Sequence, residues 1–174
     1  MTLMKMMLHR RSVRTYTDEP IPAEKLKAVV NAGLAAPTGK NTGDREFIVV
    51  TDKETLGKLS ETRIGAAKML AGAGAAIVVF GAPQVSDTWI EDCSIALTQM
   101  HLMADALGLG SCWIQGRMRP APGGETTEEA IRAILGVPED FKLVATLSLG
   151  CIDSHPEPKK EEALDQTKVH CGTW

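Results

Sequence analysis

Residues 87–114 read DTWIEDCSIALTQMHLMADALGLGSCWI and determine most of what can be predicted about the fold. Residues 87–107 predict the longest helix of the chain, because apolar residues recur at helical spacing on two of its faces. One face carries Ile90, Cys93, Leu97, Met100, Ala104 and Leu107, and the other carries Ile95, Leu102, Met103 and Ala106. A helix that is apolar nearly all round has to be covered on all sides, and a second subunit is a natural cover. Gly108 and Gly110 end the helix, and residues 112–114 predict a strand.

Helices and strands alternate on both sides of this stretch. Helices are predicted at residues 4–9, 24–35 and 63–71. Two more are predicted, one that begins after the N-cap residue Asp52 and one that lies between the capping-box residue Thr126 and Gly136. Strands are predicted at residues 47–50, 76–80 and 144–149. We therefore predict an α+β fold with three layers, α/β/α, around a short mixed or antiparallel sheet and a long central helix. One domain is expected over residues 1–174, with a polar C-terminal arm from about residue 151.

The composition and net charge of the chain argue against some classes of function. The chain has 174 residues, 44% of them hydrophobic and 24% charged, with a net charge of −3. That balance argues against a nucleic-acid or membrane-surface partner for the domain as a whole. No signal peptide or membrane-spanning run is recognised, so we expect a cytoplasmic protein with reduced thiols.

Several familiar catalytic motifs are missing from the sequence. There is no P-loop, nucleophile elbow or HExxH motif, and neither Gly72-Ala73-Gly74 nor Gly108-Leu109-Gly110 has the context of a dinucleotide fingerprint. The four cysteines and four histidines show no metal-ligand spacing, so no metal site is predicted. Cys112 and Cys151 are interpreted as buried structural thiols, with thiol catalysis as the open alternative.

Three polar segments remain, and each has an ordinary explanation when taken alone. Residues 10–14, RRSVR, place three guanidiniums and a hydroxyl within five positions, a combination that suits a phosphate or a solvated turn. Lys159 and Lys160 form a second basic pair in a charged tail. Residues 36–41, APTGKN, form a tight loop before a strand, with backbone amides and polar side chains to offer a ligand.

Taken together and in order, these segments resemble the nitroreductase family of flavoproteins. Residues 10–16, RRSVRTY, resemble the family motif R-x-S-x-R/K-x-[FY], and residues 36–41 resemble its A-P-[ST]-x-x-N loop. The following strand EFIVV at 46–50, the long helix, GLGSCWI at 108–114 and LGVP at 135–138 recur in the same order. The resemblance covers nearly the whole chain.

The resemblance implies an FMN site and assigns residues to it. Arg10, Arg11 and Ser12 are expected at the phosphate and ribityl, joined by Lys159 and Lys160. Arg14 and Lys68 are the cations expected near the pyrimidine edge, where they would tune the flavin. Pro37, Thr38, Gly39 and Asn41 are expected to reach the flavin from the other subunit of a homodimer. Backbone groups of Gln115 and Gly116 are expected near flavin N5 and O4.

The implied activity is that of an NAD(P)H-dependent FMN oxidoreductase. NADH or NADPH would donate hydride to flavin N5 in a ping-pong cycle, and a nitroaromatic, quinone or similar acceptor would take it. No side chain is predicted as acid, base or nucleophile, because the flavin performs the chemistry. The alternatives are another flavin reaction, such as reductive dehalogenation, and a flavin-binding redox-sensing module without steady-state turnover.

One segment departs from the family pattern. The family continues the loop as N-x-Q-P-W-x-F, whereas residues 41–47 read NTGDREF. Gly43, Asp44 and Arg45 therefore replace the Gln, Pro and Trp. We expect this change to alter the substrate side of the pocket more than FMN binding.

Overall fold

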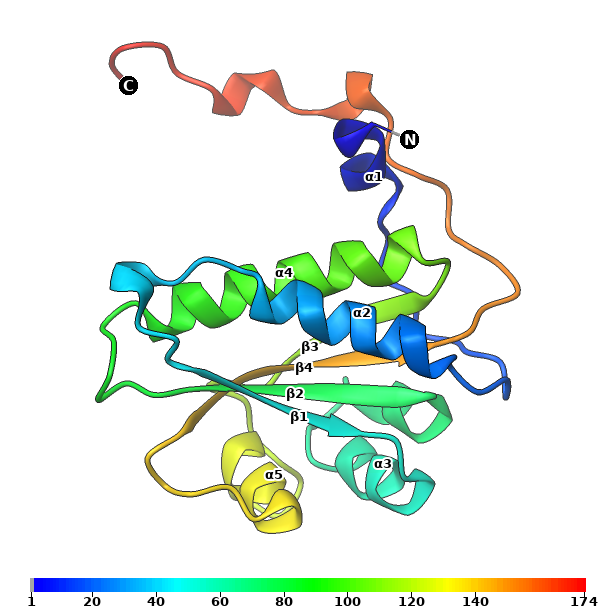
Figure 1. Cartoon of the computed structure of the whole chain (residues 1–174), viewed down its shortest axis with the longest axis vertical. Coiled ribbons are helices and arrows are strands. Elements are labelled where there is room, and N and C mark those ends of the chain that lie inside the picture. Colours follow the sequence, from blue (N-terminus) through cyan, green and yellow to red (C-terminus); the bar gives the residue numbers. More distant parts are fainter. Residues whose placement is uncertain (1) are drawn as a thin grey trace.

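A computed structural model describes residues 2–174, and its centre is a four-stranded antiparallel sheet in the order β1-β2-β4-β3 (Figure 1). The strands are β1 (Arg45–Val50), β2 (Ala75–Gly81), β3 (Gly110–Gln115) and β4 (Lys142–Gly150). The helices are α1 (Leu3–His9), α2 (Ala23–Leu34), α3 (Lys53–Ser60), α4 (Trp89–Ala106) and α5 (Thr127–Leu135). Helices α2 and α4 cover one face of the sheet, and α3 and α5 cover the other. The predicted three-layer α+β fold is confirmed.

Strand β2 divides its side chains between the two helical layers. All of its residues are buried, and successive side chains of a strand point to opposite faces. Ile77 and Val79 pack toward the α2–α4 layer, with Leu97 and Met100 of α4. The alternate residues of β2 pack toward the α3–α5 layer. A short continuous apolar run at the centre of the sheet therefore builds both cores.

Local signals explain where several helices begin and end. The Asp52 carboxylate accepts a hydrogen bond from the Thr55 N–H at 2.8 Å and so caps α3. Thr126 and Glu129 form a complete capping box at the start of α5, and Gly136 ends that helix with a φ of 67°. These positions agree with the sequence prediction.

The predicted helix over residues 63–71 is replaced by turns and one 3-10 helix, Lys68–Gly72. Gly65 has a φ of 76°, which a regular right-handed helix does not accommodate. The chain therefore turns at Gly65, and this turn lines the site described below.

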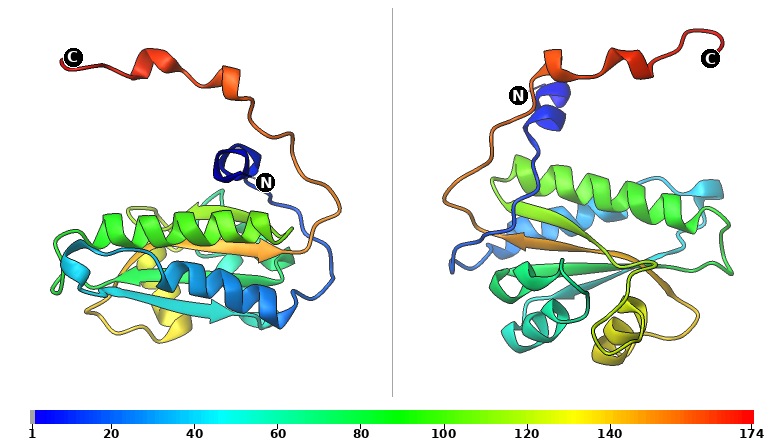
Figure 2. Two further views of the ribbon diagram at one scale, coloured as in Figure 1. Left: turned by 45° about the horizontal axis from the view of Figure 1, so that its top comes forward. Right: turned by 180° about the vertical axis from the view of Figure 1, so that it is seen from behind.

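The chain beyond β4 leaves the sheet and runs beside α1 before projecting from the body of the molecule (Figure 2). Apart from two 3-10 turns, Glu161–Ala163 and Gln166–Lys168, residues 151–174 have no regular structure. Within residues 2–174, none of the helices combines the length and the apolar character needed to cross a membrane.

Candidate flavin site

The extended segment after α1 lies against β3. Ser12 forms an isolated parallel bridge with Ser111, and the Val13 N–H donates to the Ser111 carbonyl at 2.9 Å. The Val13 side chain is buried, while Arg14 is exposed. Because side chains alternate along an extended segment, Arg10, Ser12 and Arg14 lie on the side opposite to Val13.

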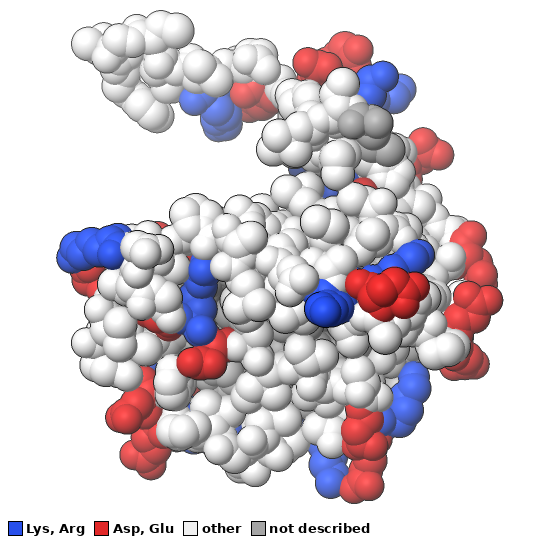
Figure 3. Space-filling model, in the orientation of Figure 1, with Lys and Arg blue, Asp and Glu red and all other residues white. Residues whose placement is uncertain are grey.

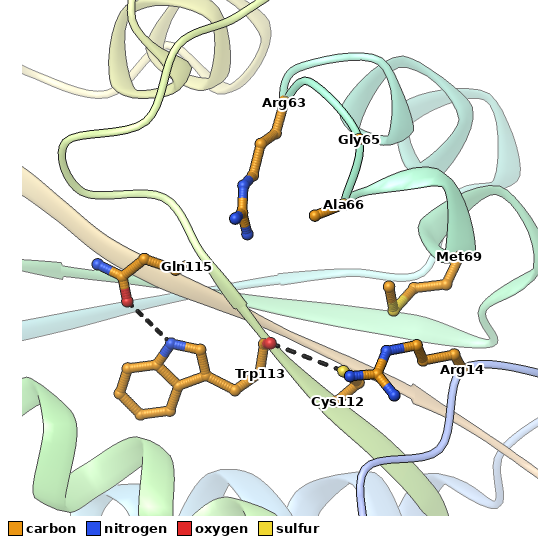
Figure 4. A pocket seen from close by; sticks show the side chains of 8 residues that line it. All are labelled: Arg14, Arg63, Gly65, Ala66, Met69, Cys112, Trp113 and Gln115. Atoms are coloured by element: carbon orange, nitrogen blue, oxygen red, sulfur yellow. Dashed lines mark hydrogen bonds between the residues drawn. The ribbon is translucent and has the colours of Figure 1, made fainter.

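Three neighbouring hollows adjoin this segment, with volumes of about 390, 460 and 270 Å³. The largest two share Trp113, and Ser12 and Arg14 each line two of the three. The 390 Å³ hollow, called the arginine pocket below, is lined by Arg14, Arg63, Gly65, Ala66, Met69, Cys112, Trp113 and Gln115 (Figure 4). It combines a flat apolar wall with two guanidiniums and contains no carboxylate.

Arg10 is fixed by a buried histidine. An Arg10 Nη1 donates to His101 Nε2 at 2.8 Å, and His101 Nδ1 then donates to the Ser111 hydroxyl. A guanidinium is always a donor, so His101 is the neutral tautomer with its proton on Nδ1. Burial, with the nearby charge of Arg10, lowers the pKa of His101 from 6.5 to about 4. The other N–H groups of Arg10 remain available to a ligand.

The C-terminal arm is attached at its root by a group that the sequence spacing did not reveal. His9 Nδ1 and His155 Nε2 lie 2.7 and 2.8 Å from the two carboxylate oxygens of Asp105, at the end of α4. The two imidazole rings are stacked with their centroids 4.2 Å apart. Each imidazole bonds its own oxygen of the Asp105 carboxylate. We therefore interpret these three residues as a hydrogen-bonded clasp, called the arm clasp below.

The arm clasp brings the second basic pair to the N-terminal segment. The Lys159 N–H donates to the Leu8 carbonyl at 2.9 Å, and Arg11 donates to the Glu157 carbonyl. Figure 2 shows the arm and α1 side by side at this point. Lys159 and Lys160 are exposed and lie beside the segment that carries Arg10 and Arg11. Two basic segments 150 positions apart in the chain are thus neighbours, as the phosphate-site prediction requires.

The loop at residues 36–41 lies at the opposite end of α4. The Gly39 N–H donates to Asp92 Oδ1 at 2.9 Å, and the Thr88 hydroxyl donates to Asp92 Oδ2 at 3.0 Å. Arg45 donates to the carbonyls of Ala36, at 2.7 Å, and Pro37, at 3.2 Å. Arg45, which departs from the family motif, therefore holds the backbone of the loop.

Pro37 and Asn41 are exposed, Thr38 and Gly39 are half-buried, and Asn41 has a φ of 56°. Within one chain the structure does not bring these four predicted loop residues to the arginine pocket.

The remaining predicted flavin contacts are Lys68, Gln115 and Gly116. Lys68 is exposed and bonds Glu61 at 2.5 Å instead of lining the arginine pocket. Gln115 lines the pocket, and its side chain accepts from Trp113 Nε1 at 3.0 Å. The Gly116 N–H already donates to the Val144 carbonyl at 3.2 Å. Arg63, which the motifs did not single out, enters the pocket instead.

Neither Cys93 nor Cys112 has the features of an activated thiol. All four are free, Cys93 and Cys112 are buried, and Cys151 is half-buried. Burial raises the pKa of Cys112, and it raises the pKa of Cys93 to about 12. A thiol nucleophile needs a lowered pKa, so the structural interpretation of Cys112 is favoured.

Comparison with solved structures first defines the class of fold. An FMN-dependent nitroreductase from Clostridium difficile R20291 superposes with a TM-score of 0.95 and 38% identity, covering 99% of this chain and 100% of that one. A nitroreductase family protein from Clostridium difficile 630 gives a TM-score of 0.83 and 26% identity over the whole of both chains. The four-stranded sheet between two helical layers is therefore the nitroreductase fold.

Sequence comparison then gives the family. The Nitroreductase family model matches residues 7–67 and 61–151. A relative from Archaeoglobus fulgidus, provisionally named NADH dehydrogenase/NAD(P)H nitroreductase, is 36% identical over 98% of both chains. An NADPH-flavin oxidoreductase from Vibrio harveyi is 26% identical over 87% of this chain and 66% of its own. This chain belongs to the nitroreductase family.

Proposed function

We propose that this chain is an NAD(P)H-dependent oxidoreductase that binds FMN and works as a homodimer. The observation that carries the proposal is the set of three hollows along residues 10–15 and β3, lined by arginines and by Trp113. The names of the relatives support both the flavin and the nicotinamide donor. The polar arm from about residue 151 belongs to the same single domain in this proposal.

The residues of the site suit the two ends of FMN. Arg10 and Ser12 lie beside the arm that carries Lys159 and Lys160, so they would hold the phosphate and ribityl with charge-assisted hydrogen bonds. Arg11 completes this group. The arginine pocket suits the ring, because Trp113 and Met69 give apolar contact and Arg14 faces a polar edge. Gln115 would contact the ring from β3.

The chain's own residues supply position and electrostatics. When bound, FMN supplies the hydride transfer between NAD(P)H and an acceptor, in two alternating half-reactions. Arg14 would place a positive charge near the ring, which would favour its reduced state. The apolar wall would exclude water from one side of the ring. The proposed acceptors are nitroaromatics and quinones.

A twofold dimer would complete the site with the loop at residues 36–41. Asp92, which holds the loop, precedes Asp105 of the arm clasp by 13 residues of α4, or about 20 Å along the helix axis. Antiparallel packing of two copies of α4 would bring the partner's loop to the Arg10 end. Ile95 on the outward face of α4 is 39% exposed, and Met7 of α1 is 47% exposed. The surface between α1 and the α2–α4 layer is mostly uncharged in Figure 3, which suits a second copy of the chain.

The first experiment is an absorbance spectrum of the purified protein followed by anaerobic NADH. Flavin bands that bleach and then recover on addition of a nitroaromatic or quinone are the expected result. Reduction once without turnover would instead fit a redox-sensing module, and no flavin after reconstitution with FMN would overturn the proposal. Size-exclusion chromatography with light scattering tests the dimer separately.

Arg10→Ala tests the phosphate end of the site. Loss of a charge-assisted contact to phosphate is expected to weaken FMN binding by roughly 10- to 100-fold. Titration of the apoprotein with FMN measures the change, and Lys168→Ala, in the exposed part of the arm, is the matched control. Unchanged affinity in Arg10→Ala would remove Arg10 from the site.

A further inference from the structure

His155 of the arm clasp faces an acceptor at both of its ring nitrogens. Its Nδ1 lies 2.7 Å from the Pro156 carbonyl, and its Nε2 lies 2.8 Å from Asp105 Oδ1. A carbonyl only accepts, so the proton of a neutral imidazole is on Nδ1, and the lone pair of Nε2 points at the carboxylate. Two acceptors at this distance repel one another. A positive charge, either a second proton or a metal ion, therefore has to lie between His155 and Asp105.

His9 adds a third donor atom to this pair. Its Nδ1 lies 2.7 Å from Asp105 Oδ2, and the candidate ligand atoms of His9, Asp105 and His155 all lie within 4.8 Å of one another. Two imidazole nitrogens, a carboxylate and a water form a ligand set that suits Zn²⁺. The bond from His155 Nδ1 to a backbone carbonyl is also the contact that orients histidines bound to a metal. His9 and His155 are 96 and 50 positions from Asp105, so the three ligands share no local spacing in the sequence.

The negative charge of Asp105 is available to a metal ion. Within residues 2–174, this carboxylate has no ion pair besides those with the two histidines. The neighbouring guanidiniums bond other groups, because Arg10 donates to His101 Nε2 and Arg11 donates to the Glu157 carbonyl.

The arm clasp has room for an ion and a water. The side chains of His9, His155 and Asp105 are 34%, 20% and 7% exposed, so the carboxylate is shielded while solvent reaches the two rings. His9 Nε2 has no hydrogen bond among residues 2–174, so the His9 ring is free to turn. The ligand atoms around tetrahedral zinc lie about 3.3 Å apart, a spacing that each of the three side chains reaches by a shift of about 1 Å or less.

We propose that the arm clasp is a structural zinc site, with His9 Nδ1, the Asp105 carboxylate and His155 Nε2 as ligands and a water in the fourth position. Zn²⁺ takes the place of the protons that join the rings to the carboxylate, and these protons are released when it binds. The ion ties the ends of α1 and α4 to the root of the arm. The inference does not depend on flavin binding.

The test measures zinc binding to the full chain as purified, with any FMN it holds, after removal of metals with EDTA. Equilibrium dialysis against Zn²⁺ and a chelator of known affinity should give one zinc per chain. His155→Ala and Asp105→Asn each remove a ligand and should weaken zinc binding by roughly 100-fold or more. His170→Ala, in the exposed tail, is the matched control and should bind zinc as the unchanged protein does.

A second measurement follows the arm itself. At a zinc concentration about 100 times the dissociation constant, opening of the root of the arm should become roughly 100-fold rarer. Trypsin cleavage after Lys159 and Lys160 should slow accordingly and recover when EDTA is added. In His155→Ala, zinc should leave the cleavage rate unchanged.

Each contrary outcome overturns the zinc site. Absence of bound zinc in the unchanged protein would show that a proton alone joins His155 to Asp105. Equal affinity in His155→Ala and Asp105→Asn, or a loss of zinc in His170→Ala, would place the ion elsewhere. Far-UV circular dichroism verifies folding, and either ligand variant keeps the test valid if the other is unstable. A chain that binds zinc but no FMN would overturn the proposed function and leave the zinc site intact.

Discussion

Both ends of α4 use an aspartate to hold a segment that the family motifs place at the flavin, but the two ends are built differently. At the N-terminal end, Asp92 accepts from a backbone amide and a hydroxyl of nearby segments. At the C-terminal end, Asp105 accepts from two imidazoles, one of them on the arm. The loop is therefore held through its backbone by residues at the start of α4, whereas the arm is held through the side chains of residues far apart in the chain.

The difference suggests separate roles for the two ends. Backbone amides and the Arg45 guanidinium give the loop a fixed shape, which suits a surface offered to a second subunit. The arm has few backbone bonds to the rest of the chain at its root, the Lys159 N–H to Leu8 among them. We expect the arm to detach at a lower free-energy cost than the loop, and the following predictions test that contrast.

The largest expected effect is a pH dependence from His101 at the arm end. The unfolded chain carries this imidazole with an ordinary pKa of 6.5, while the folded pKa is about 4. Between pH 4 and pH 6.5 the unfolded state binds a proton on His101 that the folded state does not bind. The stability that comes from the neutral imidazole is therefore fully present above pH 6.5 and is lost as the pH falls toward 4. The loss amounts to about 3 kcal/mol in the free energy of unfolding.

Urea unfolding at a fixed protomer concentration, between pH 4.5 and 7.5, measures this dependence. His101→Gln offers one acceptor and one donor without titrating, so its profile should be flatter over this range. His170→Gln, in the exposed tail, should keep the original profile. Equal slopes in both variants would show that His101 does not cause the effect.

The loop end should be most sensitive to Asp92. Asp92→Ala leaves the Gly39 amide and the Thr88 hydroxyl without their acceptor and removes an acid from the first turn of α4. We expect a loss of about 2 kcal/mol in the free energy of unfolding. Glu91→Ala removes an exposed acid from the same turn and should change stability little. Equal losses in the two variants would mean that helix charge, and not the loop, explains the effect.

The arm clasp should respond through local opening. Asp105→Asn leaves a single oxygen to accept from two imidazoles. The free energy of opening the root of the arm should therefore fall by about 1 kcal/mol, which makes opening roughly fivefold more frequent. Limited trypsin digestion, with cleavage after Lys159 and Lys160 followed by mass spectrometry, measures the opening. Asp165→Asn alters a cap farther along the arm and should not change the cleavage rate at Lys160. Unchanged cleavage in Asp105→Asn would mean that other contacts hold the arm.

The fold was largely predictable from the sequence because its signals are local. The capping box at Thr126, the N-cap at Asp52 and the apolar run of β2 each act within a few residues. The site was predictable only in part. The common side of Arg10, Ser12 and Arg14 follows from alternation along one extended segment, whereas the arm clasp joins His9, Asp105 and His155 through the tertiary fold.

The presence of Arg63, and not Lys68, among the residues that line the arginine pocket has a similar cause. A motif fixes the order of residues along the chain, but the turn at Gly65, with its φ of 76°, fixes which side chain points inward. Sequence spacing predicted a helix there, and a helix would have pointed different residues into the pocket. Sequence spacing alone therefore does not decide which side chains line the pocket.

The smallest expected effect is a gain in stability at the loop end. Asp44 is 4% exposed, and neither of its carboxylate oxygens has a hydrogen-bond partner among the described residues. Burial and the charge of Asp92 raise the pKa of Asp44, so the ionised carboxylate destabilises the fold at neutral pH and this cost disappears as the pH falls. Asp44→Asn removes the charge and should raise the free energy of unfolding by about 1 kcal/mol at pH 7.5. Asp87→Asn, at an exposed ion pair beside the same loop, should have almost no effect. Two outcomes would contradict this prediction: a lower stability of Asp44→Asn, or the same gain at pH 5 as at pH 7.5. Either would show that the ionised Asp44 carboxylate does not destabilise the loop end of α4.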